Sequence, residues 1–422
     1  AAYGYKGRVS TVGIDLGTSF SVVGVVKHGV VQIVEDNDGH KIFPSIVSFQ
    51  DNGAIYRLYD AMTYLKTDPV NTIYNAKRYI GKGDTFANDQ EQKHELQLYA
   101  ASHPYHVEFI CTTNHTNVGF KLQSTGYSNI SHANPYFKQM EESIISPEYV
   151  GSEVLNGLMK ITSEFLGHSQ VNKAVMAVPA KFTDEQRIAT AEAYRRAGLK
   201  VIRVIDEPTA AAVAYDLHKN PSVHHIIVYD FGGGTLDVSL LYVAKGSVQV
   251  YATDGDEILG GSDFDICLVD TMKRKVQLLE NGSSGSDSDS NMQTAVLQTS
   301  CSSLENRETA ESIKKLLTNA GAVSVECKMD GQEQKLQVVV TREEFYHDCA
   351  ELFNRALIPL RRLLDNLDMQ GDSVDELVLV GGSTRIPYVK ELLRDFFGPQ
   401  TRINDKIDPD VTVAFGAASI ID

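Results

Sequence analysis

Two glycine turns, each preceded by an acid, carry the residues of this chain that are best suited to chemistry. In "YDFGGGTLDVSLL", Asp230 ends an apolar run, and the turn that follows contains Gly232, Gly233, Gly234 and Thr235. Consecutive glycines let backbone N–H groups converge on a phosphate, because no Cβ blocks the approach. A tight hairpin that binds nothing would also explain the glycine triplet.

A second turn of the same kind lies near the N-terminus, in "IDLGTSFSVVGV", where Asp15 precedes Gly17. Acids beside a polyphosphate are expected mainly where Mg²⁺ lies between them. Asp15 and Asp230 therefore predict metal–nucleotide binding. Asp237 begins the return strand, where it would orient an attacking water or serve as an Asx-turn residue.

Two further segments, "NKAVMAVPAKFTDEQRIATAEAYRRAGL" and "VDELVLVGGSTRIPYVKELLRDFFG", repeat one pattern of apolar strand, small-residue turn and amphipathic helix. Thr183 and Gln186 predict a capping box for the first helix, and Gly198 is expected to end it. The second helix should bury one face, formed by Val389, Leu392, Leu393 and Phe396. The sequence thus predicts an α/β domain built twice, with a ligand cleft between the halves.

Charge and cysteine usage narrow the function classes. A formal net charge of −16 argues against nucleic acid or an anionic membrane as the main partner. No apolar run approaches the roughly 18 residues of a transmembrane helix. The cysteines show neither zinc-ligand spacing nor a disulfide framework, so we expect scattered core thiols; they are Cys111, Cys267, Cys301, Cys327 and Cys349.

Two segments interrupt the duplicated pattern. Residues 82–145 are polar and weakly periodic, which predicts a loosely ordered surface excursion. Residues 280–291 are rich in Ser, Gly and Asp, which predicts a flexible loop. Asn114, Asn129 and Asn281 lie in N-x-[ST] sequons within these segments and are compatible with secretion.

Eight motifs in order resemble the seventy-kilodalton heat-shock (stress-70) chaperone family. They are "IDLGTSFSVVGV", "NTIYNAKRYIGK", "AVPAKFTDEQR", "RVIDEPTAAAVAY", "YDFGGGTLDVSLL", "LGGSDFD", "VLVGGSTRIPYVKELL" and "DPDVTVAFGAA". The resemblance implies an actin-like α/β ATPase fold, a duplicated ribonuclease H-like core with two lobes around a nucleotide cleft. Lobe I would comprise residues 8–219 and 403–422, and lobe II residues 220–402.

The resemblance also implies site residues. Asp15 and Asp230 would hold the metal through water. Lys77 would reach the γ-phosphate and, with Thr235 and Asp237, place the attacking water, while Glu207 would couple the metal site to the lobes. The catalytic set is therefore Asp15, Lys77, Glu207, Asp230, Thr235 and Asp237. The nucleotide-binding set is Gly17, Thr18, Ser19, Phe20, Gly232, Gly233, Gly234, Thr235, Gly260, Gly261, Glu311, Lys314, Lys315, Thr318, Gly381, Gly382, Ser383, Arg385 and Asp410.

Several positions depart from the family pattern. Lys315 stands where the family usually has Arg, and an ammonium stacks on adenine less well than a guanidinium. Phe20 replaces a tyrosine, and Asp206 replaces an asparagine. Glu311 can meet both Lys314 and Lys315, because residues three and four apart share a helix face. We expect weakened nucleotide binding and altered docking of exchange factors.

The implied cofactors are ATP or ADP and Mg²⁺, with K⁺ as a further candidate ion, and the implied partners are J-domain proteins and nucleotide-exchange factors. Pro179 and Arg187 match the family's relay to a client-binding domain. The chain stops at "FGAASIID" without that domain, as in the short, microsome-associated members that it resembles most; an ATPase domain cut from a longer chain is the alternative. We therefore expect a monomer in the endoplasmic reticulum, with the cytoplasm as the other candidate.

Two rival functions remain open at the level of sequence. One is a nucleotide-gated interaction module that hardly hydrolyses ATP. The feature that suggests it is Lys315, which stands where the family usually has Arg. The other is a sugar kinase of the same fold, which needs a sugar pocket with a catalytic acid, and the sequence offers no motif for one.

Overall fold

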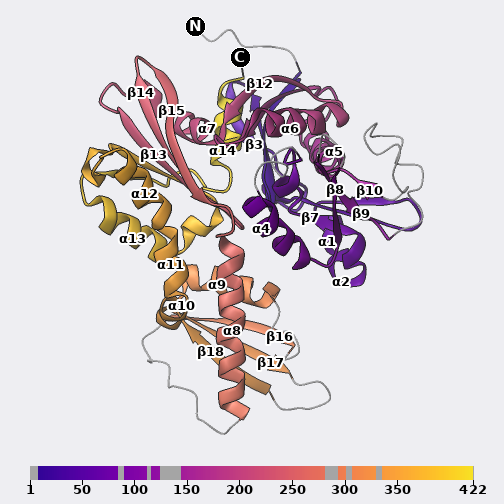
Figure 1. Ribbon diagram of the computed structural model, residues 1–422, viewed down its shortest axis with the longest axis vertical. Coiled ribbons are helices and arrows are strands. Elements are labelled where there is room, and N and C mark those ends of the chain that lie inside the picture. The colour runs from indigo at the N-terminus through magenta and orange to yellow at the C-terminus, as the bar shows by residue number, and fades with distance from the viewer. Residues whose placement is uncertain are drawn as a thin grey trace. The chain divides into compact units, whose positions relative to one another are not determined.

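The computed structural model describes residues 8–83, 90–111, 116–123, 144–280, 293–300, 307–328 and 335–421. The chain divides into two compact units (Figure 1). Unit 1 comprises Ala1–Lys219 and Asp410–Asp422, and unit 2 comprises Asn220–Pro409. Each unit has a hydrophobic core of its own, built on a central mixed sheet.

The central sheet of unit 1 has the strand order β12-β11-β1-β2-β3, with β4 paired to β2. Strands β1 and β2 are antiparallel, whereas β1 and β11 are parallel. The strands are β1 (Thr11–Leu16), β2 (Phe20–Lys27), β3 (Val30–Ile33), β4 (Phe43–Pro44), β11 (Lys173–Val178) and β12 (Lys200–Asp206).

The central sheet of unit 2 repeats this topology with the order β20-β19-β13-β14-β15. Strands β13 and β14 are antiparallel, and β13 and β19 are parallel. The strands are β13 (His225–Phe231), β14 (Leu236–Ala244), β15 (Ser247–Asp256), β19 (Glu376–Val380) and β20 (Arg402–Asn404). The predicted duplication is confirmed, because each predicted hairpin pairs in parallel with the strand of the following strand–helix unit.

Three smaller sheets complete the described strands. Unit 1 has the orders β6-β5-β7 and β10-β9-β8, and unit 2 has β16-β17-β18. Their bounds are β5 (Ile46–Phe49), β6 (Ile55–Arg57), β7 (Thr72–Tyr74), β8 (His106–Cys111), β9 (Thr116–Lys121), β10 (Ile144–Ile145), β16 (Thr294–Ser300), β17 (Ala322–Lys328) and β18 (Lys335–Thr341).

The helices of unit 1 begin and end where local chemistry predicts. In α6, Thr183 and Gln186 form the expected capping box, and Gly198 follows the helix with a positive φ of 76°. The helices are α1 (Tyr59–Met62), α2 (Tyr64–Thr67), α4 (Gln90–Ala101), α5 (Pro147–Leu166), α6 (Asp184–Arg196), α7 (Glu207–Ala214) and α14 (Thr412–Ser419), with 3₁₀ turns η1 (Pro69–Asn71), η2 (Ala76–Tyr79) and η6 (Leu217–Lys219).

In unit 2, α13 places its predicted face against the core: Val389 and Leu393 are buried, and Leu392 and Phe396 pack beside them. In Figure 1, α12 and α13 flank the central sheet of unit 2, and α8 and α9 lie beside its small sheet. The helices are α8 (Gly261–Glu280), α9 (Arg307–Asn319), α10 (Arg342–Asp348), α11 (Ala350–Ala356), α12 (Ile358–Asn366) and α13 (Pro387–Phe397), with 3₁₀ turns η8 (Gly371–Ser373) and η9 (Gly382–Arg385).

Close packing of α14 fixes the end of the chain within unit 1. Gly416 lies so near α7 that a Cβ there would be 1.8 Å from the carbonyl oxygen of Ala210. Gly13 of β1 is equally confined, since its Cβ would be 2.3 Å from the backbone nitrogen of Ala418. These contacts place Asp410, just before α14, in the same unit as Asp15.

The interpretation of residues 82–145 as a loosely ordered excursion is wrong for its described part. Residues 90–111, 116–123 and 144–145 form α4 and the sheet of β8, β9 and β10. Tyr105 and Phe120 are buried in the core of unit 1. Polar composition concealed this order because a few apolar residues at the right places supply the buried contacts.

A disulfide corrects the expectation of scattered core thiols. Cys267 of α8 and Cys349, between α10 and α11, are bonded with a Cα–Cα distance of 6.0 Å. The two cysteines are 82 residues apart, so no local spacing announced the pair. The bond joins α8 to the α10–α11 junction inside unit 2.

Three further expectations are located by the structure. Residues 403–409, predicted with lobe I, belong to unit 2, where β20 pairs with β19. Asn114, Asn129, Asn281 and residues 281–291 lie outside the described residues, and Glu280 is the last residue of α8. None of the helices in the described ranges combines the length and the apolar character that crossing a bilayer requires.

Candidate functional site

The first glycine turn connects β1 to β2 in unit 1. A Cβ on Gly17 would lie 2.0 Å from the carbonyl oxygen of Phe20, so only glycine fits this bend. Ser45 holds the turn from outside: its hydroxyl donates to Gly17 O (2.8 Å) and its backbone N–H donates to Ser19 O (2.9 Å). Thr18 lies within the same bend, and Phe20 begins β2 with 40% of its surface exposed.

Charged side chains gather beside this turn from four separate parts of unit 1. Asp15 lies one residue before the end of β1, Lys77 lies in η2, Glu207 begins α7, and Asp410 precedes α14. Lys77 Nζ lies 2.8 Å from Glu207 Oε1, and the two side chains are only 10% and 13% exposed. Phe182 covers the ammonium group, with 5.6 Å between Nζ and the ring centroid.

The electrostatics of this acid–lysine cluster are strongly perturbed. Burial and, to a smaller extent, repulsion from Glu207 and Asp410 raise the pKa of Asp15 to about 7, while Lys77 opposes the change. Burial, together with the charges of Asp15 and Glu207, also raises the pKa of Tyr194 well above its ordinary value. A divalent cation beside Asp15 would favour the ionised form of its carboxyl group.

The second glycine turn connects β13 to β14 in unit 2. Asp230 and Asp237 are direct cross-strand partners at its base, so their side chains lie on the same face of the sheet. The backbone N–H of Gly232 donates to Thr235 O (3.0 Å) and closes the turn. The two predicted roles, metal at Asp230 and water at Asp237, thus fall on neighbouring residues of one surface.

Residues from two other elements pack against the second turn. The N–H groups of Gly261 and Ser262 donate to the carbonyls of Gly232 (3.0 Å) and Gly233 (2.8 Å). A Cβ on Gly260 would lie 2.3 Å from the nitrogen of Gly234. These residues, with Ser383 below, form what we call the glycine nest: Gly232, Gly233, Gly234, Thr235, Gly260, Gly261 and Ser383.

Ser383 and Gly381 support the glycine nest from the end of β19. Ser383 Oγ donates to Gly232 O (2.8 Å), and a Cβ on Gly381, whose φ is 81°, would meet Phe231 O at 2.4 Å. Gly382 begins η9, and Arg385 at its end forms an ion pair with Asp408. The N–H groups of Gly232 and Gly261 donate within the nest, so phosphate binding would fall to its other backbone groups, which glycine leaves uncovered by a Cβ.

The two lysines of α9 have different environments. Lys314 Nζ lies 2.7 Å from Asp265 Oδ1 and donates to Gly261 O (2.7 Å), with 13% of its side chain exposed. Lys315 pairs with Glu311 at 2.7 Å and is 68% exposed. Glu311 thus pairs with Lys315, whereas the described ion pair of Lys314 is with Asp265, a partner that the sequence did not predict. Thr318 Oγ donates to Lys314 O (3.3 Å).

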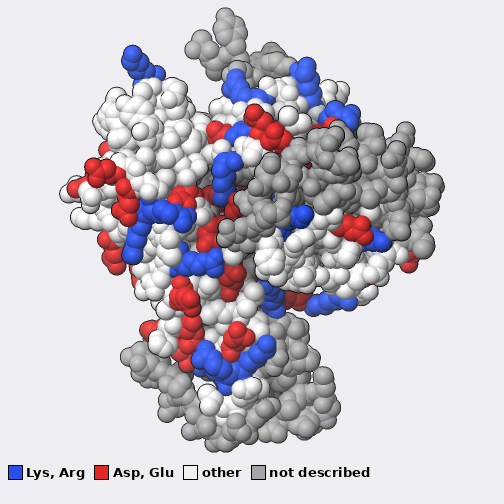
Figure 2. All heavy atoms as spheres, in the orientation of Figure 1, with Lys and Arg blue, Asp and Glu red and all other residues white. Residues whose placement is uncertain are grey.

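Figure 2 shows acidic and basic side chains beside one another around α8 and α9. Burial raises the pKa of Asp265, and Lys314 opposes that change. The sequence could have placed Asp265 near the nest, because it lies four positions after Gly261 and therefore on the same face of α8. This spacing does not predict that Asp265 pairs with Lys314, which lies on α9.

Arg187, predicted as part of a relay, contacts the residue that precedes Glu207 of the acid–lysine cluster. Its guanidinium pairs with Asp206 at 2.8 Å and donates to the carbonyls of Ala180 (3.2 Å) and Phe182 (3.1 Å). Asp206 directly precedes Glu207. The aspartate that departs from the family pattern therefore has a partner at the junction of β12 and α7.

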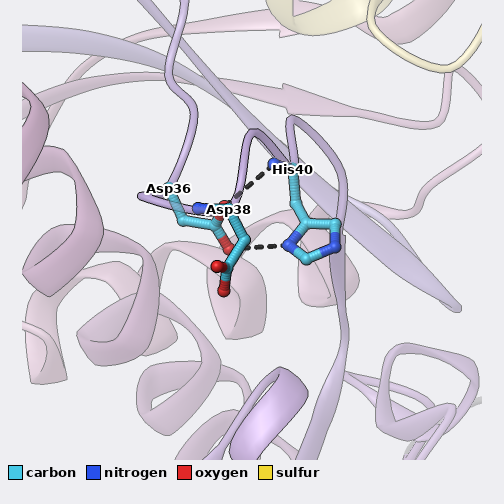
Figure 3. A group of neighbouring side chains, drawn as sticks. All are labelled: Asp36, Asp38 and His40. Atoms are coloured by element: carbon cyan, nitrogen blue, oxygen red, sulfur yellow. Dashed lines mark hydrogen bonds and ion pairs between the residues drawn. The ribbon is translucent and has the colours of Figure 1, made fainter.

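A separate group of ligand-type side chains, Asp36, Asp38 and His40, lies in the loop between β3 and β4 (Figure 3). Asp36 Oδ1 accepts from the N–H groups of Asp38 (3.0 Å) and His40 (2.8 Å), and its Oδ2 lies 2.9 Å from His40 Nδ1. The carboxylate thus serves as the acceptor that shapes an exposed loop. This group is unrelated to the predicted site residues.

The structure therefore collects the predicted residues into two sets. Unit 1 holds Asp15, Gly17, Thr18, Ser19, Phe20, Lys77, Glu207 and Asp410, and unit 2 holds the other predicted residues, from Asp230 to Arg385. Sequence reasoning missed Ser45, Tyr194 and Asp265, which contact these sets from elements far along the chain.

The repeated strand order and the paired acid–glycine turns define an actin-like α/β protein with two lobes. A family model described as Hsp70 protein matches residues 11–422. Chaperone protein dnaK of Cyanidioschyzon merolae is 35% identical over 412 residues, which cover 96% of this chain. The chain belongs to the Hsp70 protein family, and it spans 60% of the length of that relative.

Proposed function

We propose that this chain binds ATP with Mg²⁺ and hydrolyses it slowly to ADP and phosphate, as a chaperone-type ATPase. One observation carries the proposal: the same acid–glycine turn occurs at equivalent positions of two repeats, with Asp15 beside a lysine and acids in one and a glycine nest in the other. Charge and open backbone are the two things that a metal-bound polyphosphate requires.

The residues divide the work of phosphoryl transfer. Asp15 and Asp230 hold the water shell of the metal, and Mg²⁺, when bound, neutralises charge on the phosphates. The glycine nest and the turn from Gly17 to Ser19 bind phosphate oxygens through backbone N–H groups. Lys314 and Glu311 bind the adenosine.

Hydrolysis follows from positioning and charge neutralisation, without a covalent enzyme intermediate. A water attacks the γ-phosphorus in line, the bond to the β–γ bridging oxygen breaks, and the water's proton passes to a phosphate oxygen or to Asp237. Lys77 and Thr235 orient that water. Glu207 Oε1 lies 2.8 Å from the Lys77 ammonium, and both side chains are mostly buried. Closure of the lobes is coupled to the nucleotide state.

The decisive experiment is single-turnover hydrolysis of labelled ATP by the purified chain with Mg²⁺. Lys77→Ala and Asp15→Ala are expected to lower the rate by roughly 100-fold or more. Lys66→Ala and Asp60→Ala serve as matched controls, since these residues lie in α2 and α1, outside the proposed site. Unchanged rates in both site variants would remove the enzymatic assignment.

A nucleotide-gated interaction module remains the second candidate. The observation in its favour is Lys315, which is 68% exposed and paired with Glu311, where a planar guanidinium would stack better on adenine. The same single-turnover experiment separates the candidates, because a module binds ADP and ATP in calorimetric titration but leaves labelled ATP intact.

We further propose residence in the lumen of the endoplasmic reticulum, and J-domain proteins and exchange factors as partners. The disulfide between Cys267 and Cys349 supports an oxidising compartment, since such bonds are rare in the cytosol. Non-reducing peptide mapping of protein isolated from microsomes should recover the Cys267–Cys349 cross-link. Free thiols at both positions in freshly alkylated native protein would contradict this location.

J-domain dependence is tested by turnover with and without an added J-domain protein. The predicted relay residue Arg187 retains an ion pair with Asp206, next to Glu207, which motivates the expectation of stimulation. No change in turnover at saturating J-domain protein would argue against this class of partner.

A further inference from the structure

The turn that carries Lys77 has little stabilisation of its own. Lys77 lies in η2, a short 3₁₀ turn that follows β7 and Asn75. Asn75 has a left-handed backbone with φ 57° and ψ 23°, and its side chain makes no cap hydrogen bond to η2. One short turn after a left-handed residue does not fix a lysine by itself, since 3₁₀ turns are brief and their hydrogen bonds are poorly aligned. Contacts from elsewhere must hold it.

Two tyrosine hydroxyls hold the chain just before the turn. The Tyr105 hydroxyl donates to the carbonyl oxygen of Tyr74 at 2.6 Å. The Asn75 side-chain amide donates to the Tyr99 hydroxyl at 2.8 Å. Tyr99 lies in α4, and Tyr105 lies between α4 and β8, so both come from the segment that composition alone suggested was loosely ordered.

Aromatic contacts continue this support on either side of Lys77. The Tyr74 and Tyr105 rings meet edge to face with centroids 5.1 Å apart. The Arg78 guanidinium lies over the Tyr99 ring at 4.4 Å, and Tyr79 meets Phe120 of β9 at 5.5 Å. The α4–β9 segment, by which we mean residues 90–111 and 116–123, therefore contacts the residues that precede and follow Lys77.

Lys77 itself contacts a different group. Its ammonium lies 2.8 Å from Glu207 Oε1 and 5.6 Å from the Phe182 ring centroid. The turn is thus anchored by α4 and β9 while its lysine is directed to the acid–lysine cluster. Displacement of the anchor would move the ammonium, because only one short turn separates the two.

We propose that Tyr99 and Tyr105 are positioning residues for Lys77, and that through them the α4–β9 segment sets the rate of ATP hydrolysis. The inference rests on the proposed function, in which Lys77 orients the attacking water. Neither tyrosine belongs to the proposed nucleotide-binding set. Both act by fixing the backbone at Tyr74 and Asn75, from which the lysine extends.

The consequence is a selective effect on the chemical step. Displacements near 1 Å can slow a positioned reaction by about 100-fold. Loss of one hydroxyl frees the turn only partly, so we expect Tyr99→Phe or Tyr105→Phe to lower the single-turnover rate about 3- to 10-fold, and the double variant about 10- to 30-fold. ADP affinity should change by less than about 2-fold, because the proposed contact of Lys77 is with the γ-phosphate, which ADP lacks.

Asn75 provides an internal rescue. Asn75→Gly keeps the left-handed backbone available but removes the amide, so it should match Tyr99→Phe. Asn75→Asp keeps the side-chain shape and accepts a hydrogen bond from the Tyr99 hydroxyl, so most of the rate should return. Combining Asn75→Gly with Tyr99→Phe should cost no more than either change alone, because both remove the same hydrogen bond.

The experiment combines single-turnover hydrolysis, ADP titration and amide hydrogen exchange of residues 72–80 in the nucleotide-free protein. Tyr64→Phe is the matched control, since it removes a hydroxyl that hydrogen-bonds to Tyr56 at the surface of unit 1. The proposal expects faster exchange at 72–80 and slower turnover in the Tyr99 and Tyr105 variants, with ADP affinity and the control unchanged.

Each outcome decides something definite. Wild-type turnover that persists in the double variant would overturn the proposal, as would an equal loss of ADP affinity and rate, which marks a general structural role. An inactive wild type would instead overturn the proposed function, and the exchange measurement would still decide whether Tyr99 and Tyr105 hold the Lys77 turn.

Discussion

The two glycine turns share a strand topology but differ in what surrounds them. The turn of unit 1 is closed by Ser45 and lies beside ionisable side chains, of which Asp15 has a pKa raised to about 7. The turn of unit 2 is closed by other glycines, with Lys314 at its edge. Both turns follow an acid, but charged side chains surround the first turn, whereas backbone contacts among glycines surround the second. In the proposed function, the acid–lysine cluster of unit 1 serves the metal and the attacking water together with Asp230, Thr235 and Asp237 of unit 2. The glycine nest serves the phosphates together with the turn from Gly17 to Ser19 of unit 1.

The largest expected effect breaks the glycine nest. Gly260→Ala puts a Cβ 2.3 Å from the Gly234 nitrogen, so backbone must move, at a cost of about 3 kcal/mol in the unfolding free energy of unit 2 and with loss of ADP binding. Thermal unfolding and calorimetric titration measure both quantities.

Gly232→Ala is the matched stability control for that change, because its Cβ would meet Thr235 O at an ordinary 3.6 Å. Equal destabilisation by the two substitutions would show that the nest is not the tightly packed element described above.

Removing the charge of one lysine at a time tests whether Lys77 and Lys314 serve different parts of the proposed reaction. Lys77→Met should lower the single-turnover rate roughly 100-fold and leave ADP affinity nearly unchanged. Lys314→Met should instead raise the Kd of ADP roughly 10-fold, because Lys314 lies at the glycine nest. The rate at which bound ATP is hydrolysed should stay nearly unchanged. Each variant is the other's control, since both leave a mostly buried acid without its lysine. If both variants lost hydrolysis rate and ADP affinity to the same extent, the proposed difference between the two lysines would be wrong.

The raised pKa of Asp15 predicts pH-dependent stability. The folded protein retains the Asp15 proton up to about pH 7, whereas the unfolded chain loses it near the ordinary value of 3.8. Stability from this group is therefore lost as pH rises between about 4 and 7. Asp15→Asn should be no more stable than wild type near pH 4.5 and more stable by about 1–2 kcal/mol at pH 8, without nucleotide or Mg²⁺.

Thermal unfolding from pH 4.5 to 8 measures that difference, with Asp60→Asn as an exposed-carboxylate control. A stability difference that does not vary with pH would mean that Asp15 is ionised in the folded protein without penalty.

The smallest expected effect concerns the proposed adenosine contacts of unit 2. Lys315→Arg supplies a planar guanidinium at an exposed position of α9 and should tighten ADP binding about 3-fold. Lys273→Arg on α8 makes the same exchange away from the glycine nest and should leave the affinity unchanged. Calorimetric titration at constant ionic strength decides between a stacking role and a plain ion pair with Glu311.

Much of the architecture was predictable from local patterns. The capping box of Thr183 and Gln186, the buried face of α13 and both strand–turn–strand units follow from helical period, strand alternation and turn chemistry, which act over a few residues. The predicted site residues also fell into two clusters, because the strands that carry them pair as the duplication requires. Composition misled at residues 82–145, where buried aromatic residues such as Tyr105 and Phe120 outweigh a polar average.

The sequence by itself determined the repeated fold, the Hsp70 family and the residue types at both glycine turns, because turn glycines, paired acids and apolar periodicity are local signals. Only the tertiary structure decided which distant residues meet: Lys314 with Asp265, Cys267 with Cys349, and Tyr99 with Asn75. Such pairs depend on where separate helices and strands come to lie. No spacing within the chain specifies that placement, since each contact forms only when a complete core has fixed both partners.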